Sequence, residues 1–191
     1  MTDFGGVGEI TISKGWITFT RVGGNVEIYA YDLAGEQLTN ISDHPADQFN
    51  SRNDGPRVVW TDLRADPAAE YYDWSTYGAA DIWFYDIETQ EQRQITSGNG
   101  VQLYPDIHGD WIVWQDYREC PNPDSPFGCC KRVWGYNLAT DEERRLSHVS
   151  SEHARVWDDR VYFDSRYQDE PPMAAVFVQE IYSDAGPDGG S

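Results

Sequence analysis

The sequence lacks the features of a membrane-inserted, nucleic-acid-binding or helical protein. No apolar run approaches the roughly 20 residues that a membrane-spanning helix needs, and no window carries an apolar stripe at helical spacing. Of its 191 residues, 14 are lysine or arginine and 33 are aspartate or glutamate, which gives a net charge of −19. Because nucleic acids and anionic membrane surfaces repel a protein of this charge, neither is expected as a partner.

The local signatures of common enzymes are also missing. There is no G-x-S-x-G elbow, no H-E-x-x-H pair and no phosphate-cradling glycine loop. We therefore expect a protein without catalytic residues and without a bound metal or cofactor. No basic region followed by an apolar stretch opens the chain, so a signal peptide is not expected in this sequence.

What the chain does contain is a repeat of β-type segments. The segments EIYAYDL, DIWFYDI and RVWGYNL begin at Glu27, Asp81 and Arg132, at intervals of 54 and 51 residues. Each follows an alternating segment such as DWIVWQD and precedes a polar one such as EQRQIT. Four short alternating segments within about 40 to 50 residues are typical of one blade of a β-propeller.

These segments resemble the TolB-like, PD40-type (WD40-like) β-propeller repeats. In that family a strand of the form G-D-R-I-V-W-x-D-x-R leads to D-I-Y-x-Y-D-L-x-T-G and then to x-I-T. DWIVWQDYR at Asp110 and DIWFYDIET at Asp81 carry the likeness, which extends from about Gly8 to Ile181. The resemblance implies the fold, whereas the family's functions are broad and include binding, assembly and covers on hydrolases.

We predict an all-β chain that forms a propeller of about four blades, or part of a larger one. Three blades are expected to be complete, and the fourth lacks an evident outer strand. The expected divisions are a tail at 1–7, blades at about 8–42, 50–97, 103–148 and 152–181, and a linker-like tail at 182–191. An open blade exposes an unpaired strand edge. Self-association through that blade, closure as a small ring and pairing with the N-terminal segment are three ways to cover it.

An Asp-x-Arg pattern follows the second strand of three blades, at Asp62 and Arg64, Asp116 and Arg118, and Asp164 and Arg166. The first blade has Arg21 in place of the aspartate. Because short Asp side chains bond readily to nearby backbone N–H groups, we expect each Asp to cap a loop and to pair with its Arg between blades. The alternative is a ring of carboxylates that holds a cation such as calcium. Asp116 and Arg118 are also candidates for ligand binding.

A long insertion in the second blade carries four aromatic residues, Tyr71, Tyr72, Trp74 and Tyr77. Carboxylates flank them, and flat rings beside carboxylates suit a sugar or a cationic group. We treat the four residues as a candidate ligand-binding set. The competing interpretation is that these rings pack the loop onto the scaffold.

The three cysteines lie close together in one loop, at Cys120, Cys129 and Cys130. A disulfide from Cys120 to either of the others would close this loop, which favours an extracellular or periplasmic location. Reduced thiols and a metal site are the alternatives, although the spacing matches no common zinc pattern.

The leading functional hypothesis is a non-enzymatic propeller module that binds a protein or glycan through the long loops of blades two and three. One rival is a carbohydrate-active enzyme, a lyase or glycosidase, that uses loop carboxylates with His153 or Arg155. The other rival is a structural unit that assembles through its open blade edge. His148 and His153 bracket Glu152, an arrangement from which a metal or acid-base site can be built.

Overall fold

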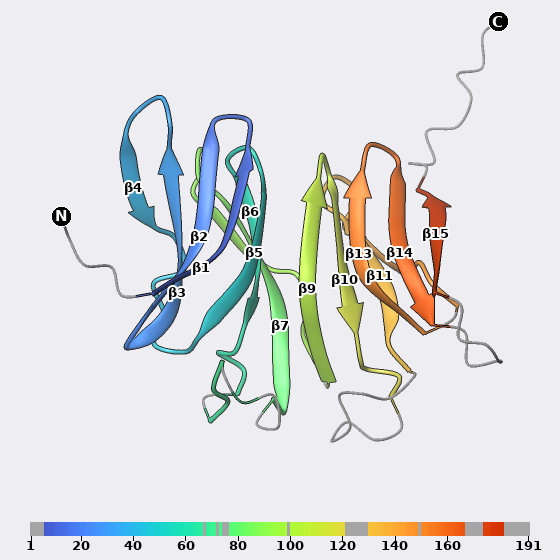
Figure 1. Ribbon diagram of the computed structural model, residues 1–191. Helices are drawn as coiled ribbons and strands as arrows, with labels where there is room; N and C mark the ends of the chain where they lie inside the picture. Colours follow the sequence, from blue (N-terminus) through green and yellow to red (C-terminus); the bar gives the residue numbers. More distant parts are fainter. Residues whose placement is uncertain are drawn as a thin grey trace, which may run out of the picture.

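A computed structural model describes residues 6–66, 68–71, 73, 77–98, 100–120, 130–148, 150–166 and 174–181. These residues form antiparallel sheets that stand side by side as an open fan, with blade one at one end and blade four at the other (Figure 1). The prediction of an all-β partial propeller is therefore confirmed. Within the described residues, no helix is long and apolar enough to cross a membrane.

Blades one and two each contain four strands in sequence order. Blade one is formed by β1 to β4, at Gly6–Ser13, Trp16–Gly23, Asn25–Asp32 and Gln37–Asn40. Blade two is formed by β5 to β8, at Gln48–Asp54, Arg57–Asp62, Ala79–Asp86 and Glu91–Gln94.

Blade three repeats this order, and the described part of blade four has three strands. Blade three is formed by β9 to β12, at Gly100–His108, Trp111–Asp116, Arg132–Asn137 and Glu142–Arg145. Blade four is formed by β13 to β15, at Ser151–Trp157, Arg160–Arg166 and Ala174–Glu180. A short parallel pairing between β7 and β9 joins the second and third blades.

The second strands of blades two and three, β6 and β10, are buried on both faces because each of these blades lies between two others. Every residue of β10 is buried, whereas the fourth strands β4, β8 and β12 are largely exposed and polar. The core consists of apolar layers between consecutive sheets. Trp60 and Val58 pack with Ile28 between blades one and two, and Val113 packs with Val156 between blades three and four.

Blades one to three each end in Ile or Leu followed by Ser or Thr, and this ending has a structural cause. The hydroxyls of Ser42, Thr96 and Ser147 accept hydrogen bonds from the backbone N–H of the third strand, at 2.8 to 2.9 Å. The preceding apolar residue, Ile95 in blade two, is buried in the core. A buried hydroxyl here satisfies an N–H that the short fourth strand does not reach, and this explains why the pattern recurs in blades one to three.

Candidate functional site

The first strand of every blade carries a β-bulge at the same place. Its bulged residue has a positive φ and is not glycine in any blade: 37° at Glu9, 56° at Asn50, 56° at Tyr104 and 53° at His153. The strand register shifts at each of these points. A bulge re-aims the side chains next to it. We call the surface formed around these bulges by β1, β5, β9 and β13 the inner-strand surface.

Blades one and two are linked directly on this surface. The Glu9 carboxylate accepts hydrogen bonds from the backbone N–H of Asn50 at 2.6 Å and from its side-chain amide at 2.5 Å. Burial, together with the negative charge of Glu9, raises the pKa of Tyr104 to about 12. Its hydroxyl is therefore neutral at physiological pH.

Two residues beyond the bulges, blades two, three and four place alternating charges at Arg52, Asp106 and Arg155. Asp106 accepts a hydrogen bond from the backbone N–H of Val156 at 2.9 Å, and burial raises its pKa. Burial and the positive charge of Arg155 lower the pKa of Arg52. Asp106 of blade three thus interacts electrostatically with an arginine of each neighbouring blade, Arg52 and Arg155.

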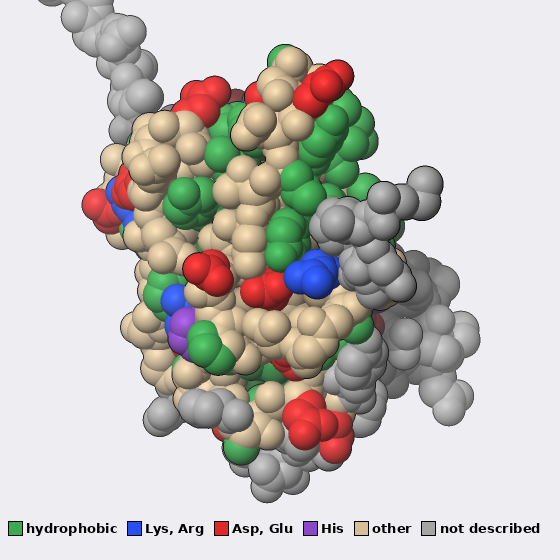
Figure 2. Space-filling model, turned by 90° about the vertical axis from the view of Figure 1, so that its left-hand side faces the viewer, with side chains coloured by type: hydrophobic (Ala, Val, Ile, Leu, Met, Phe, Trp, Pro, Cys, Tyr) green, Lys and Arg blue, Asp and Glu red, His purple; other side chains and the backbone are tan. Residues whose placement is uncertain are grey.

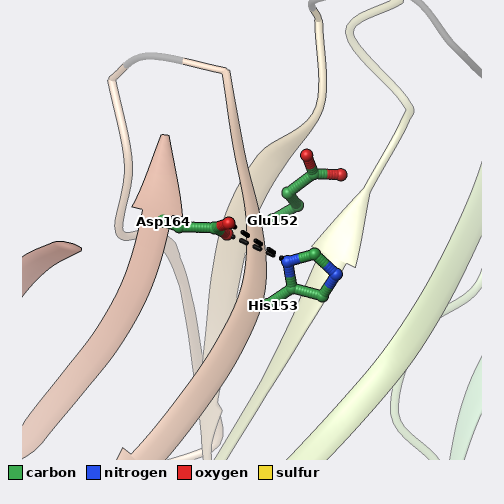
Figure 3. A group of neighbouring side chains, drawn as sticks. All are labelled: Glu152, His153 and Asp164. Carbon is green, nitrogen blue, oxygen red and sulfur yellow. Dashed lines mark hydrogen bonds and ion pairs between the residues drawn. The ribbon is translucent and has the colours of Figure 1, made fainter. Parts of the chain in front are cut away.

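A second cluster lies at the blade-four end of this surface (Figure 3). The Nδ1 atom of His153 lies 3.1 and 3.2 Å from the two carboxylate oxygens of Asp164, and Glu152 points toward the same space. Lys131 donates a hydrogen bond to Glu152 at 2.5 Å. One imidazole and two carboxylates are donors that suit a first-row transition metal better than calcium. Because Lys131 and His153 already occupy both carboxylates, the bonds shown here favour a closed polar cluster.

The Asp-x-Arg pattern forms a buried clamp within blades two and three. Asp116 accepts hydrogen bonds from Trp114 Nε1 at 2.9 Å, from the Arg118 backbone N–H at 2.8 Å and from Arg118 Nε at 2.8 Å. Asp62 makes the same bonds to Trp60 and Arg64. Each arginine also lies over a tryptophan ring of its own blade.

This geometry corrects the expected pairing of Asp with Arg between blades, since both pairs lie within one blade. It also gives Asp116 no access to a ligand, because its side chain is buried and its bonds are internal. Arg118 is further held by Glu143 at 2.6 Å.

Blade four departs from the pattern by one residue. Asp62 and Asp116 lie opposite Gln48 and Gln102, at the start of the first strand, and the matching position in blade four is Ser165, opposite Ser151. Asp164 therefore lies on the other face of β14, because a shift of one residue reverses the side-chain direction. The predicted equivalence of Asp164 and Arg166 with the other pairs is wrong, and no ring of three equivalent carboxylates forms.

The aromatic insertion of blade two packs inward where it is described. Tyr77 is buried, donates a hydrogen bond to the Tyr71 carbonyl at 2.8 Å, and lies with Tyr71 against Phe49. These contacts fit the packing interpretation for both rings. Tyr72 and Trp74 lie outside the described residues, so their ligand-binding role remains a prediction.

The cysteine loop contains a disulfide between Cys120 and Cys130, with their Cα atoms 5.1 Å apart. This pairing is one of the two that the sequence left open. Cys129 lies outside the described residues.

The two end blades expose apolar side chains on their outward faces. On blade one these are Val7, Ile10, Ile12, Leu33 and Leu38. Figure 2 shows this face, with hydrophobic side chains gathered mainly in its upper half. At the opposite end, blade four exposes Val176 and Val178. Its Trp157 is also exposed, but the ring packs on His108 of blade three. We call these two surfaces the leading face of blade one and the trailing face of blade four.

Comparison with known proteins identifies the fold. The chain is similar to TolB from Acinetobacter baumannii, with a TM-score of 0.59 and 13% identity over 87% of this chain and 40% of that one. The fold is a TolB-like β-propeller. The chain is also similar to the β-propeller domain of the trilobed protease from Pyrococcus furiosus, with a TM-score of 0.62 and 14% identity over 94% of this chain and 56% of that one.

A third similar structure is the acylaminoacyl peptidase of Pyrococcus horikoshii, with a TM-score of 0.57 and 12% identity over 91% of this chain and 30% of that one. The chain thus spans 30 to 56% of the length of these three proteins. No protein-family model matches its sequence, and no curated protein matches it.

Sequence reasoning missed the inner-strand surface. The bulged residues Glu9, Asn50, Tyr104 and His153 share no chemistry, and only their equal distance from the following turn links them. None of these positions is a glycine, so no residue type in the sequence indicated a positive φ there.

Proposed function

We propose that this chain is a propeller interaction module that binds a second copy of itself through its two end faces. The observation that carries the proposal is that both end faces repeat the surfaces that consecutive blades bury against each other inside the chain.

The leading face of blade one matches the buried leading face of blade four. Counted from the bulge, Ile10 and Ile12 occupy the positions of Ala154 and Val156. Ala154 and Val156 are 0% and 4% exposed because blade three covers them, whereas Ile10 and Ile12 are 66% and 67% exposed. Blade one therefore presents larger apolar side chains at positions that a neighbouring blade would cover.

The trailing face of blade four shows the same relation to blade three. Val176 pairs with Asp164 just as Val133 pairs with Gln115, which makes the two valines equivalent by register. Val133 is 0% exposed beneath blade four, and Val176 is 73% exposed. Val178, two residues further along β15, is 55% exposed.

A second copy fits both faces because the contact would continue the interface already formed between blades. The trailing face of one copy would pack on the leading face of the other, and the reverse contact would form on the far side. Two fans of four blades would then close a ring of about eight, the upper end of the range that propellers use. Covering an exposed Ile or Val contributes about 1.5 to 3 kcal/mol. In a closed ring, Ile10, Ile12, Val176 and Val178 of both copies would together contribute about 12 to 24 kcal/mol, against a cost of association of roughly 4 to 15 kcal/mol.

An oxidising compartment is part of the proposal. The Cys120–Cys130 disulfide supports an extracellular or periplasmic location, since cytosolic thiols are kept reduced.

The test is the mass of the protein in solution, measured by sedimentation equilibrium. We expect a dimer for the native chain, a monomer for Ile12→Asp and a monomer for Val176→Asp. Glu88→Lys, in the exposed turn after β7, is the matched control and should remain dimeric. A native chain that stays monomeric at high concentration would overturn the proposal.

Mixing the two variants tests the head-to-tail arrangement. Ile12→Asp retains a native trailing face and Val176→Asp retains a native leading face, so the mixture regains one intact contact. We expect it to form a heterodimer that neither variant forms alone. A mixture as monomeric as its components would exclude head-to-tail contact.

A further inference from the structure

The fourth strands of blades one, two and three share one sequence pattern. With the two residues that follow each strand, they read QLTNIS, EQRQIT and EERRLS, at 37–42, 91–96 and 142–147. Four residues, all polar except Leu38, precede an Ile or Leu and then a Ser or Thr. The first four residues pair antiparallel with the third strand of the same blade.

The last two residues of the pattern make the same contacts in all three blades. The Ile or Leu donates its backbone N–H to the carbonyl of one third-strand residue at 2.8 to 3.0 Å, and the following hydroxyl accepts the N–H of that same residue. In blade three these contacts join Leu146 and Ser147 to Val133. The Ile or Leu side chain is at most 9% exposed, because it packs between its own blade and the next.

Blade four presents the same third strand, but β15 is the last strand of its sheet in the part of the chain that the structure describes (Figure 1). Val176 holds the position of Val133, and a second contact supports this register. Ile181, five residues beyond Val176, donates its N–H to the turn before β14, just as Leu138 donates to the turn before β10. Because strand groups alternate in direction, the N–H and C=O groups of Val176 and Val178 point away from β14.

Residues 1–191 hold no unused segment that fits this edge. In all three complete blades the pattern contains an Ile or a Leu, and outside the described residues the sequence has neither. A fourth strand for blade four that follows the pattern would therefore come from another chain.

We propose that β15 binds an extended segment of another protein in which an Ile or Leu is followed by a Ser or Thr. The segment would add to the sheet antiparallel, as peptides do when they extend an exposed strand edge. Its Ile or Leu would cover Val176, which is 73% exposed, and its hydroxyl would accept the Val176 N–H. Both this contact and the proposed dimer use the trailing face of blade four, but neither requires the other.

The probe is the peptide TQEQRQIT, the sequence of residues 89–96, acetylated and amidated at its ends. Two comparison peptides, TQEQRQAT and TQEQRQIV, lack the Ile side chain and the hydroxyl. Binding is measured by ¹H–¹⁵N spectroscopy and amide hydrogen exchange on the full chain carrying Ile12→Asp. This change alters the leading face of blade one and leaves β15 native, so failure of the dimer proposal would not affect the result.

We expect the probe to slow exchange of the Val176 and Val178 amides and to leave those of Phe177 and Gln179, which face β14, unchanged. Each comparison peptide should bind about tenfold more weakly. Val178→Pro removes one outward N–H from an edge strand, where proline is tolerated, and should weaken binding about tenfold. Val178→Thr keeps this N–H and is the matched control.

Three results would overturn the proposal. The first is slow exchange of the Val176 amide before any peptide is added, since the edge would then already be paired. The second is no protection of the Val176 and Val178 amides by the probe, and the third is equal binding of all three peptides.

Discussion

Replacing Asp116 by alanine should destabilise the protein far more than the same change at Asp164, although both occur in an Asp-x-Arg pattern. Asp116 is buried and bonds to Trp114 and Arg118, whereas Asp164 is about one-third exposed and pairs with His153 on the surface. The comparison isolates the effect of a one-residue difference in strand register.

The magnitudes follow from what each change leaves behind. Asp116→Ala leaves the indole N–H of Trp114 and the backbone N–H of Arg118 without their acceptor, and leaves the Arg118 guanidinium with Glu143 as its remaining partner. Removing one partner of a buried ion pair costs about 3 to 5 kcal/mol. Asp164→Ala removes an exposed pair, for which the typical cost is about 0 to 1 kcal/mol. In a domain of this size, 1 kcal/mol lowers Tm by roughly 2 to 4 °C, so the first variant should lose at least about 6 °C.

The measurement is urea and thermal unfolding followed by tryptophan fluorescence and circular dichroism. Asp116→Asn, which keeps one acceptor oxygen, serves if the alanine variant does not fold, and it should fall between the two. If Asp164→Ala costs as much as Asp116→Ala, then Asp164 belongs to a buried clamp and the assigned register of blade four is wrong.

Three further outcomes are expected. Replacing both Cys120 and Cys130 by serine should lower the free energy of unfolding by about 2 to 3 kcal/mol, since their bond closes a short loop; an unchanged urea midpoint would contradict this. Burial alone would raise the pKa of Asp54, but hydrogen bonds from Lys14 and a backbone N–H outweigh it and lower that pKa. Asp54 therefore stabilises the fold above its ordinary pKa of 3.8 and loses this effect as pH falls through the lowered value, so Asp54→Asn should flatten acid unfolding below about pH 4. Gly100→Ala should cost about 1 to 3 kcal/mol in urea unfolding, because φ is +108° and a Cβ would lie 3.1 Å from backbone; native stability would argue against that backbone conformation.

The repeat architecture could be read from the sequence because each blade meets the same physical demands. Trp60 and Trp114 fill equivalent core positions, and Ser42, Thr96 and Ser147 satisfy equivalent backbone N–H groups. A requirement repeated in every blade leaves a repeated residue type, which an alignment of the chain with itself detects.

The site could not be read in this way, since its residues are those that differ between blades. Asp164 keeps the Asp-x-Arg spacing but not the register, and only the pairing of β13 with β14 reveals the shift. Tyr77 looked like a ligand-binding ring, yet its contacts with Phe49 depend on how the insertion folds back onto the scaffold. Spacing along the chain does not specify which face of a strand a side chain occupies.

The bulges explain how the blades can share the same core residues and still differ in the side chains around their first strands. A non-glycine residue with positive φ is disfavoured by about 1 to 2 kcal/mol, yet Glu9, Asn50, Tyr104 and His153 all adopt it. Because the extra residue interrupts the side-chain alternation of the first strand, it brings neighbouring side chains such as Glu152 and His153 toward one space. The scaffold thus repeats a backbone distortion while varying the residue that it presents. For this reason the core can remain alike from blade to blade while the residues of the inner-strand surface differ.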